Sequence, residues 1–139
     1  MITAERFAQG LTFPEYLAQM RANRERFVHR LAGADIRPGD REALHGLGGK
    51  LRILVITEDW CGDALVSLPT LARLVEDDPD VQLRVFLRDA SPDVMDHYLK
   101  RGLYRTIPVF VFFDEHMNEL ARFTERQDVL TELRTLSKV

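Results

Sequence analysis

The second half of the chain alternates short apolar runs with amphipathic stretches. Residues 51–57 (LRILVIT) and 108–113 (PVFVFF) are almost continuously apolar, which is typical of strands covered on both faces of a sheet. Residues 81–87 (VQLRVFL) alternate apolar and polar positions, and residues 119–124 (ELARFT) follow a short polar turn. Both patterns indicate strands. We therefore predict a four-stranded sheet.

Helical patterns lie between and after these strands. One helix is expected at about 62–77, and another from about 91 to 100, where Gly102 ends it. A final amphipathic helix is expected over 126–139. Its inward-facing side chains would be Val129, Leu130, Leu133 and Leu136. This order predicts two parallel crossovers followed by a hairpin, and hence an α/β/α three-layer sandwich around a mixed sheet.

The first fifty residues have a different pattern. The segment TFPE at 12–15 has the form of a capping box, and apolar residues recur at helical spacing behind it. We expect one long helix at about 13–31 and a short helical turn at 41–46. The chain is thus predicted to be a single domain, in which a helical extension (1–49) precedes an α/β core (50–139).

Composition narrows the class of protein. The chain has 139 residues, of which 45% are hydrophobic and 29% charged, with a net charge of −3. It has no basic run of the kind that binds nucleic acid. No stretch approaches the roughly 20 apolar residues of a membrane span. With one cysteine and no apolar leader at its start, the protein is expected to be cytoplasmic.

The segment EDWCGDA at 58–64 carries the candidate chemistry. It places Trp60-Cys61-Gly62 at the turn from a strand into a helix, and Thr106-Ile107-Pro108 opens a later strand. These motifs and their spacing resemble the thioredoxin family over about residues 50–139. In that family the redox motif is Trp-Cys-Gly-Pro-Cys, and a cis proline faces the nucleophilic sulfur. The resemblance implies a thioredoxin-like fold and a site where Cys61 meets Pro108.

Two departures from the family motif change the expected chemistry. Asp63 and Ala64 occupy the places of the proline and of the second cysteine, and Val55 occupies that of a buried acid. A dithiol cycle needs one sulfur to attack the substrate disulfide and another to resolve the mixed disulfide. Cys61 can perform only the first step. We therefore expect a monothiol disulfide oxidoreductase in which an external thiol resolves the adduct.

The resemblance also implies roles for the neighbours of Cys61. Trp60 would be a docking surface or simply a shielding aromatic, and Gly62, Ile107 and Pro108 would frame the substrate. The backbone of Ile107 would be free to pair with an extended partner. Asp63 would act as a proton acceptor for Cys61, or would merely be an acid that stabilises the first turn of the helix. The expected partners are protein disulfides and low-molecular-weight thiols.

The charges near Cys61 argue for a slow nucleophile. A helix N-terminus favours a thiolate by about 0.3–1 kcal/mol. Glu58, Asp59 and Asp63 oppose it, and a single carboxylate about 7 Å away costs the thiolate roughly 0.6–1.2 kcal/mol. Two other interpretations stay open: a non-catalytic binding module in which Cys61 is incidental, and a redox sensor that works through a sulfenic acid or an intermolecular disulfide.

No cofactor or metal is expected. The histidines are scattered without the paired spacing of metal sites; they are His29, His45, His97 and His116. CGDA is similar to the CGFS motif of monothiol glutaredoxins, which hold an iron–sulfur cluster. Those proteins carry a Gly-Gly pair after the hairpin and a lysine just ahead of the cysteine, where this sequence has FTERQDV and TED.

Overall fold

A computed structural model of the protein describes residues 1–125 and 127–137. Its four strands form one mixed sheet, as the sequence predicts, and their order across the sheet is β2-β1-β3-β4. The strands are β1 (Leu51–Thr57), β2 (Val81–Leu87), β3 (Val109–Phe113) and β4 (Glu119–Phe123). β1 is parallel to β2, whereas β3 is antiparallel to both β1 and β4.

The expectation of a second parallel crossover is therefore wrong. The chain between β2 and β3 contains only α6 (Pro92–Met95) and the 3₁₀ turn η1 (Asp96–Tyr98). A parallel connection needs an element long enough to return along the sheet. These two turns are too short for that. β3 thus starts at the edge of the sheet where β2 ends, and runs in the opposite direction.

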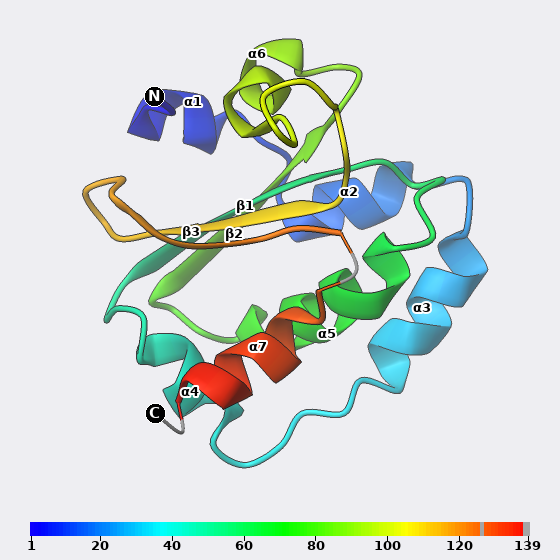
Figure 1. Ribbon diagram of the computed structural model, residues 1–139. Coiled ribbons are helices and arrows are strands. Elements are labelled where there is room, and N and C mark those ends of the chain that lie inside the picture. The colour runs from blue at the N-terminus through cyan, green and yellow to red at the C-terminus, as the bar shows by residue number, and fades with distance from the viewer. Residues whose placement is uncertain (126, 138–139) are drawn as a thin grey trace.

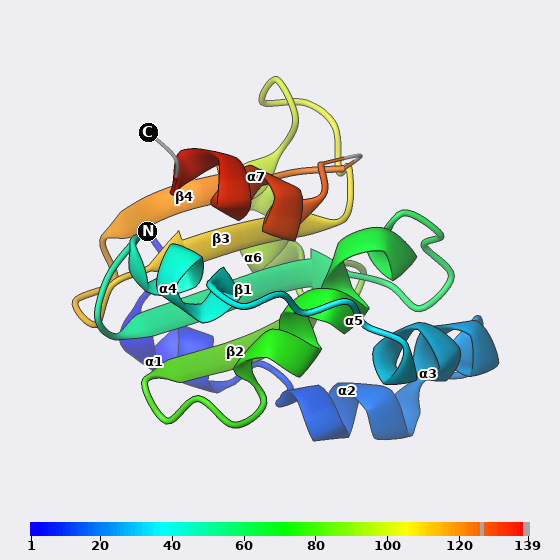
Figure 2. The ribbon, with the colours of Figure 1, turned by 90° about the horizontal axis from the view of Figure 1, so that it is seen from below.

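Helices cover both faces of the sheet (Figure 1). One face carries α3 (Arg24–Ala32), α4 (Asp40–His45), α5 (Ala64–Val75) and α7 (Val129–Leu136), and the other carries α1 (Ala4–Ala8), α6 and η1. α2 (Phe13–Gln19) lies beside β2 (Figure 2). The result is the predicted three-layer sandwich, with the N-terminal helices distributed between the two layers.

The pleat of the central strands divides the core in two. Ile53 and Val55 of β1 pack under α5 and α7, whereas Leu54 and Ile56 pack on the opposite face, toward α6. Successive side chains of a strand point to opposite faces, so a strand covered on both sides must be apolar at every position. All five residues of β3 are buried for the same reason. This confirms the prediction made from the apolar run at 108–113.

The N-terminal segment begins as the sequence predicts but is not one helix. The capping box at the start of α2 is present, with Glu15 N–H donating to Thr12 Oγ1 at 3.3 Å and Glu15 Oε1 accepting from Thr12 N–H at 2.8 Å. The expected single helix over 13–31 is wrong, because α2 ends at Gln19 and α3 begins at Arg24. Asn23, at φ 60°, is left-handed and interrupts the helix.

The later helices also differ from the prediction at their ends. The helix expected over 91–100 is α6 followed by the 3₁₀ turn, and it ends at Tyr98. In α7, Val129, Leu130 and Leu133 are buried as predicted, but Leu136 is 51% exposed because it lies in the last turn. Residues 126 and 138–139 of the expected 126–139 helix lie outside the described residues.

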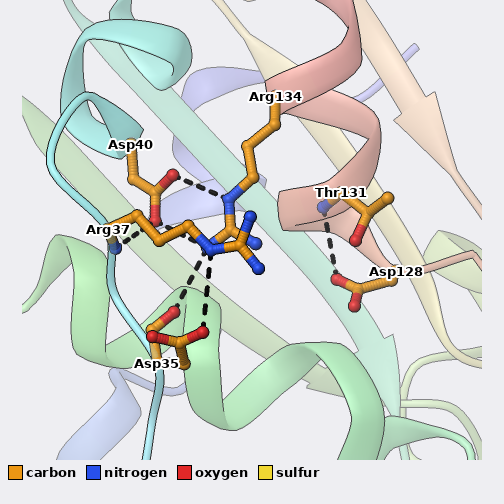
Figure 3. Close-up of polar contacts among 6 residues, drawn as sticks. All are labelled: Asp35, Arg37, Asp40, Asp128, Thr131 and Arg134. Atoms are coloured by element: carbon orange, nitrogen blue, oxygen red, sulfur yellow. Dashed lines mark hydrogen bonds and ion pairs between the residues drawn. The ribbon is translucent and has the colours of Figure 1, made fainter.

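An ion pair joins α4 to α7 (Figure 3). Arg134 donates to both carboxylate oxygens of Asp40 at 2.8 Å, and the Asp40 side chain is only 3% exposed. The backbone N–H of Arg37 also donates to this carboxylate, at 2.7 Å. The bonds to Arg134 hold the pKa of Asp40 below its usual range, against the opposing effect of burial. The pair fixes the C-terminal helix to the helical extension.

Candidate functional site

Cys61 lies in the short connection between β1 and α5. Its backbone N–H donates to the carbonyl of Glu58 at 3.1 Å, which closes a tight turn just before the helix. Its side chain is buried, with 9% of its surface exposed. The sulfur lies 3.8 Å from the carbonyl oxygen of Ile107. A carbonyl only accepts, so the thiol is the donor in this contact.

The register of the sheet brings Cys61 to Ile107. Ile56 near the end of β1 pairs with Val109 at the start of β3. The segment after Ile56 and the segment before Val109 therefore emerge side by side at one edge of the sheet. The peptide bond between Ile107 and Pro108 in the second segment is cis. The two predicted halves of the site, 60–63 and 107–108, thus lie together.

Trp60, the aromatic residue of the Cys61 turn, is 52% exposed. The guanidinium carbon of Arg88 lies 4.9 Å from the centre of its ring, a cation–π arrangement. Arg88 donates to the carbonyl of Arg105 at 3.2 Å, and Arg105 donates to the carbonyl of Arg88 at 3.1 Å. The segment before Pro108 and the loop after β2 are therefore tied to each other beside Trp60.

Arg88 and Arg105 are functional candidates that reasoning from the sequence missed. They lie 27 and 44 positions from Cys61 in a sequence where the nearest neighbours of the cysteine are acidic. A signal was present in the strand pattern, however. β1 and β2 are parallel and in register, with Thr57 opposite Leu87, so the residue after Leu87 emerges at the same edge as the cysteine turn.

The acids around Cys61 have distinct environments. Glu58 accepts a hydrogen bond from the backbone N–H of Asp89 at 2.9 Å. Asp59 accepts from the backbone N–H groups of Arg21 and Ala22 at 2.8 and 3.1 Å. Within the described part of the chain, Asp63 forms no side-chain hydrogen bond, and it is exposed at the start of α5. Two of the three carboxylates thus bind neighbouring loops, and Asp63 alone is open to the thiol or a partner.

The helical extension packs directly against this turn. Asn23 donates its side-chain amide to the carbonyl of Asp59 at 3.0 Å, which adds to the two bonds made by the Asp59 carboxylate. Tyr16 of α2 is 1% exposed. Burial raises its pKa above the ordinary value, and the charges of Asp59 and Glu58 raise it further. The break between α2 and α3 therefore forms a bracket that holds the cysteine loop.

The position of the missing sulfur is occupied by a buried methyl group. Ala64, the first residue of α5, is 3% exposed. Gly62 is exposed, with open space where a side chain would lie. Val55, at the position of the family's buried acid, is completely buried in the core under α5. The site therefore has one sulfur, no internal carboxyl at position 55, and an open surface on the helix side.

The structure is compatible with neither a metal-binding cluster nor a membrane-spanning helix in the residues that it describes. No group of three or more histidine, cysteine, aspartate or glutamate side chains in 1–125 and 127–137 is arranged to hold a metal ion. In the same ranges, none of the helices has the length and apolar character needed to cross a bilayer.

Comparison with known proteins agrees with this geometry. The family model described as Thioredoxin matches residues 10–138. The chain therefore belongs to the thioredoxin family. The match includes the helical bracket as well as the α/β core, which extends the resemblance beyond the 50–139 seen in the sequence. A search of the curated proteins finds no match.

Two solved structures with TM-scores of 0.70 or more show the same fold. A protein of unknown function from Pseudomonas aeruginosa is 24% identical with a TM-score of 0.72, covering 99% of this chain and 87% of that one. An HIV epitope scaffold is 26% identical with a TM-score of 0.70, covering 91% and 78%. Fasciola hepatica thioredoxin, at 22% identity and a TM-score of 0.49, covers 70% and 86%.

Proposed function

We propose that the protein is a monothiol disulfide oxidoreductase in which Cys61 is the nucleophile and an external thiol completes the cycle. The observation that carries this proposal is the placement of the single sulfur. Cys61 lies at the start of a helix, 3.8 Å from the Ile107 carbonyl and next to a half-exposed Trp60, while the residue three positions on is Ala64. We place the reaction in the cytoplasm, where small thiols are kept reduced.

The reaction takes place in two exchanges. The Cys61 thiolate attacks one sulfur of a substrate disulfide, the substrate S–S bond breaks, and the other sulfur leaves as a thiolate that takes up a proton. A Cys61–substrate disulfide remains. An external thiol then gives up its proton and attacks the substrate sulfur, so that Cys61 is released and the substrate keeps a disulfide to the external thiol. No net oxidant or reductant is needed beyond that thiol.

The neighbouring residues have defined roles in this proposal. Asp63 takes the Cys61 proton as the sulfur leaves the Ile107 carbonyl and passes it to solvent, because its carboxylate is the one not already bound to a neighbouring loop. Once it is ionised again, the same carboxylate opposes the thiolate at equilibrium, so Asp63 serves as a proton relay and does not raise the thiolate population. Trp60 and Gly62 form the exposed surface on which the partner lies. Ile107 offers its backbone to an extended substrate segment, and Pro108 fixes that segment at the start of β3.

The competing function is a binding module that grips a partner without exchanging disulfides. The 9% exposure of Cys61 favours it, because attack on a protein disulfide requires the sulfur to be reached. Affinity capture separates the two, since a monothiol site without a resolving sulfur retains its own substrates. Wild type and Cys61→Ser are used as baits, each eluted with and without reductant. Partners released by reductant and absent from Cys61→Ser support the exchange; the same partners on both baits would show a module.

A further inference from the structure

A basic groove lies beside the cysteine turn, on the break between α2 and α3. It has a volume of about 560 Å³ and is lined by Arg21, Asn23, Arg24, Glu25 and Arg26. We call it the arginine groove. Three guanidinium groups and one carboxylate face it, in a chain whose net charge is −3. The positive charge is therefore concentrated locally, against the balance of the molecule.

The arginines of the groove are available to a partner. Within the part of the chain that the structure describes, no carboxylate forms an ion pair with Arg21, Arg24 or Arg26, and Arg26 makes only a 3.4 Å contact with the side-chain oxygen of Asn23. Besides Glu25, which lines the groove, the carboxylate of Asp59 is joined to this segment by hydrogen bonds. It accepts from two backbone N–H groups rather than from a guanidinium.

The same hydrogen bonds place the backbone of the groove segment beside the cysteine turn. Asp59 binds the backbone of Arg21 directly, and it precedes Cys61 by two residues, a separation of at most about 7 Å along the backbone. An extended peptide advances about 3.3 Å per residue. A partner whose cysteine reaches Cys61 would therefore place residues two to six positions away over the arginines. Acids immediately beside that cysteine would instead meet Asp63.

We propose that the arginine groove recognises acidic side chains that flank the reactive cysteine of a partner protein. The proposal rests on the proposed disulfide exchange and names its substrate class: protein disulfides in acidic segments. The planar guanidinium binds a carboxylate through two parallel hydrogen bonds. Clustered charge of one sign also raises the rate of encounter with an oppositely charged partner, and salt screens the effect. The groove thus selects the partner, and Cys61 performs the exchange.

Two matched peptides test the preference. Each has one cysteine activated as a mixed disulfide with 2-thiopyridine; one carries glutamates two to six residues from the cysteine, and the other carries glutamines. The attack of Cys61 releases thiopyridone, whose absorbance gives the rate. At low salt the acidic peptide should react about 10-fold faster, and 0.5 M NaCl should remove most of the difference. Arg24→Glu should abolish the preference. Arg73→Glu, the same charge change far along α5, should keep it.

Binding without chemistry separates this inference from the proposed function. Fluorescently labelled versions of both peptides with serine in place of cysteine are titrated by anisotropy. The acidic peptide should bind more tightly than the neutral one to wild type and to Arg73→Glu, but not to Arg24→Glu. Equal binding of the two peptides, or a preference that survives in Arg24→Glu, overturns the proposal that the arginine groove recognises acidic side chains. A Cys61 that reacts with no disulfide, including small neutral 2,2′-dithiodipyridine, overturns only the exchange reaction.

Discussion

Replacing Arg134 by methionine should destabilise the fold far more than replacing any exposed arginine. The substitution keeps most of the apolar stem but removes the guanidinium that donates twice to Asp40. The carboxylate left behind is 3% exposed, while Arg134 itself is 20% exposed. Removing one partner of a buried pair costs about 3–5 kcal/mol, because the remaining charge is uncompensated. We expect about 3 kcal/mol, since Arg134 retains some contact with water.

The expected shift in melting temperature follows from the size of the chain. An unfolding entropy of about 2.1 cal/mol/K per residue gives roughly 0.3 kcal/mol/K for the domain, so 3 kcal/mol corresponds to about 10 °C. The control is Arg73→Met. The ion pair of Arg73 with Glu76 is half-exposed on both sides, and such pairs contribute about 0–1 kcal/mol. Calorimetry and urea unfolding at pH 7 measure both variants.

The pH dependence gives an independent check. The pKa of Asp40 is lowered in the folded state. Its contribution to the free energy of unfolding is therefore fully present above the ordinary pKa near 4, and it is lost as the pH falls through the pKa of the folded state. The difference between wild type and Arg134→Met should therefore be largest at pH 6–7 and shrink below about pH 4. Equal losses for Arg134→Met and Arg73→Met, or a difference that does not change with pH, would refute the reasoning.

Three further predictions concern the Cys61 thiol and the hydrogen bond between His45 and Asp78. In a reductase assay in which a dithiol serves as the external thiol, wild type should be the least active, because each Cys61 adduct must wait for that thiol. Ala64→Cys should be more active, and Ala64→Cys combined with Val55→Asp the most active but less stable, since a buried carboxyl is costly. A wild type as active as Ala64→Cys would contradict the expected advantage of an internal second sulfur. Alkylation of the single thiol at pH 7 should be slow and should accelerate in Asp63→Pro, which removes the free carboxylate; an unchanged rate would exclude this electrostatic effect. Both ring nitrogens of His45 face acceptors, and its hydrogen bond to Asp78 raises its pKa against the effect of burial. The contribution of His45 to the free energy of unfolding is present below about pH 6.5 and is lost as the pH rises through the pKa of the folded state. The urea midpoint of His45→Gln should therefore approach that of wild type as the pH increases from 5.5 to 8.5.

The strands were predictable because burial on two faces leaves a continuous apolar run. β1 and β3 could be placed to within one residue from that pattern, and the TFPE segment located the start of α2. The direction of β3 was not predictable from periodicity. It depends on how far α6 and its 3₁₀ turn carry the chain, and short helical segments have no reliable signal in the sequence.

Only those parts of the candidate site that form a recognisable motif in the sequence could be predicted. Trp60 and Cys61 form a motif, and the family spacing pointed to Pro108. Arg88 and Arg105 were missed because they are distant along the chain and near Trp60 only in space. Arg88 reaches Trp60 through strand pairing, and Asp59 is bound by the break in a helix that the apolar spacing predicted to be continuous. Hydrogen bonds between loops of different elements have no periodic signature.

The hydrogen bonds to Asp59 indicate what the N-terminal helices do in the fold. Their connection also pairs with the sheet, because Leu11, between α1 and α2, makes a single antiparallel bridge to Val85 at the outer edge of β2. Beyond covering the sheet, they bring Asn23 and the backbone of Arg21 to Asp59. The extension therefore holds the cysteine loop from the side on which the arginine groove opens, and in our proposal the same turn also selects the partner.

The most direct test of the account is the fate of the Cys61 adduct. Wild type and Ala64→Cys are mixed with a small excess of a neutral disulfide, quenched at intervals with acid and weighed intact by mass spectrometry. Wild type should accumulate one adduct per chain, which persists until an external thiol is added and then disappears. In Ala64→Cys the adduct should be short-lived and give way to an internal disulfide. A wild-type chain that forms no adduct, or that loses it without added thiol, would contradict single-sulfur exchange at Cys61.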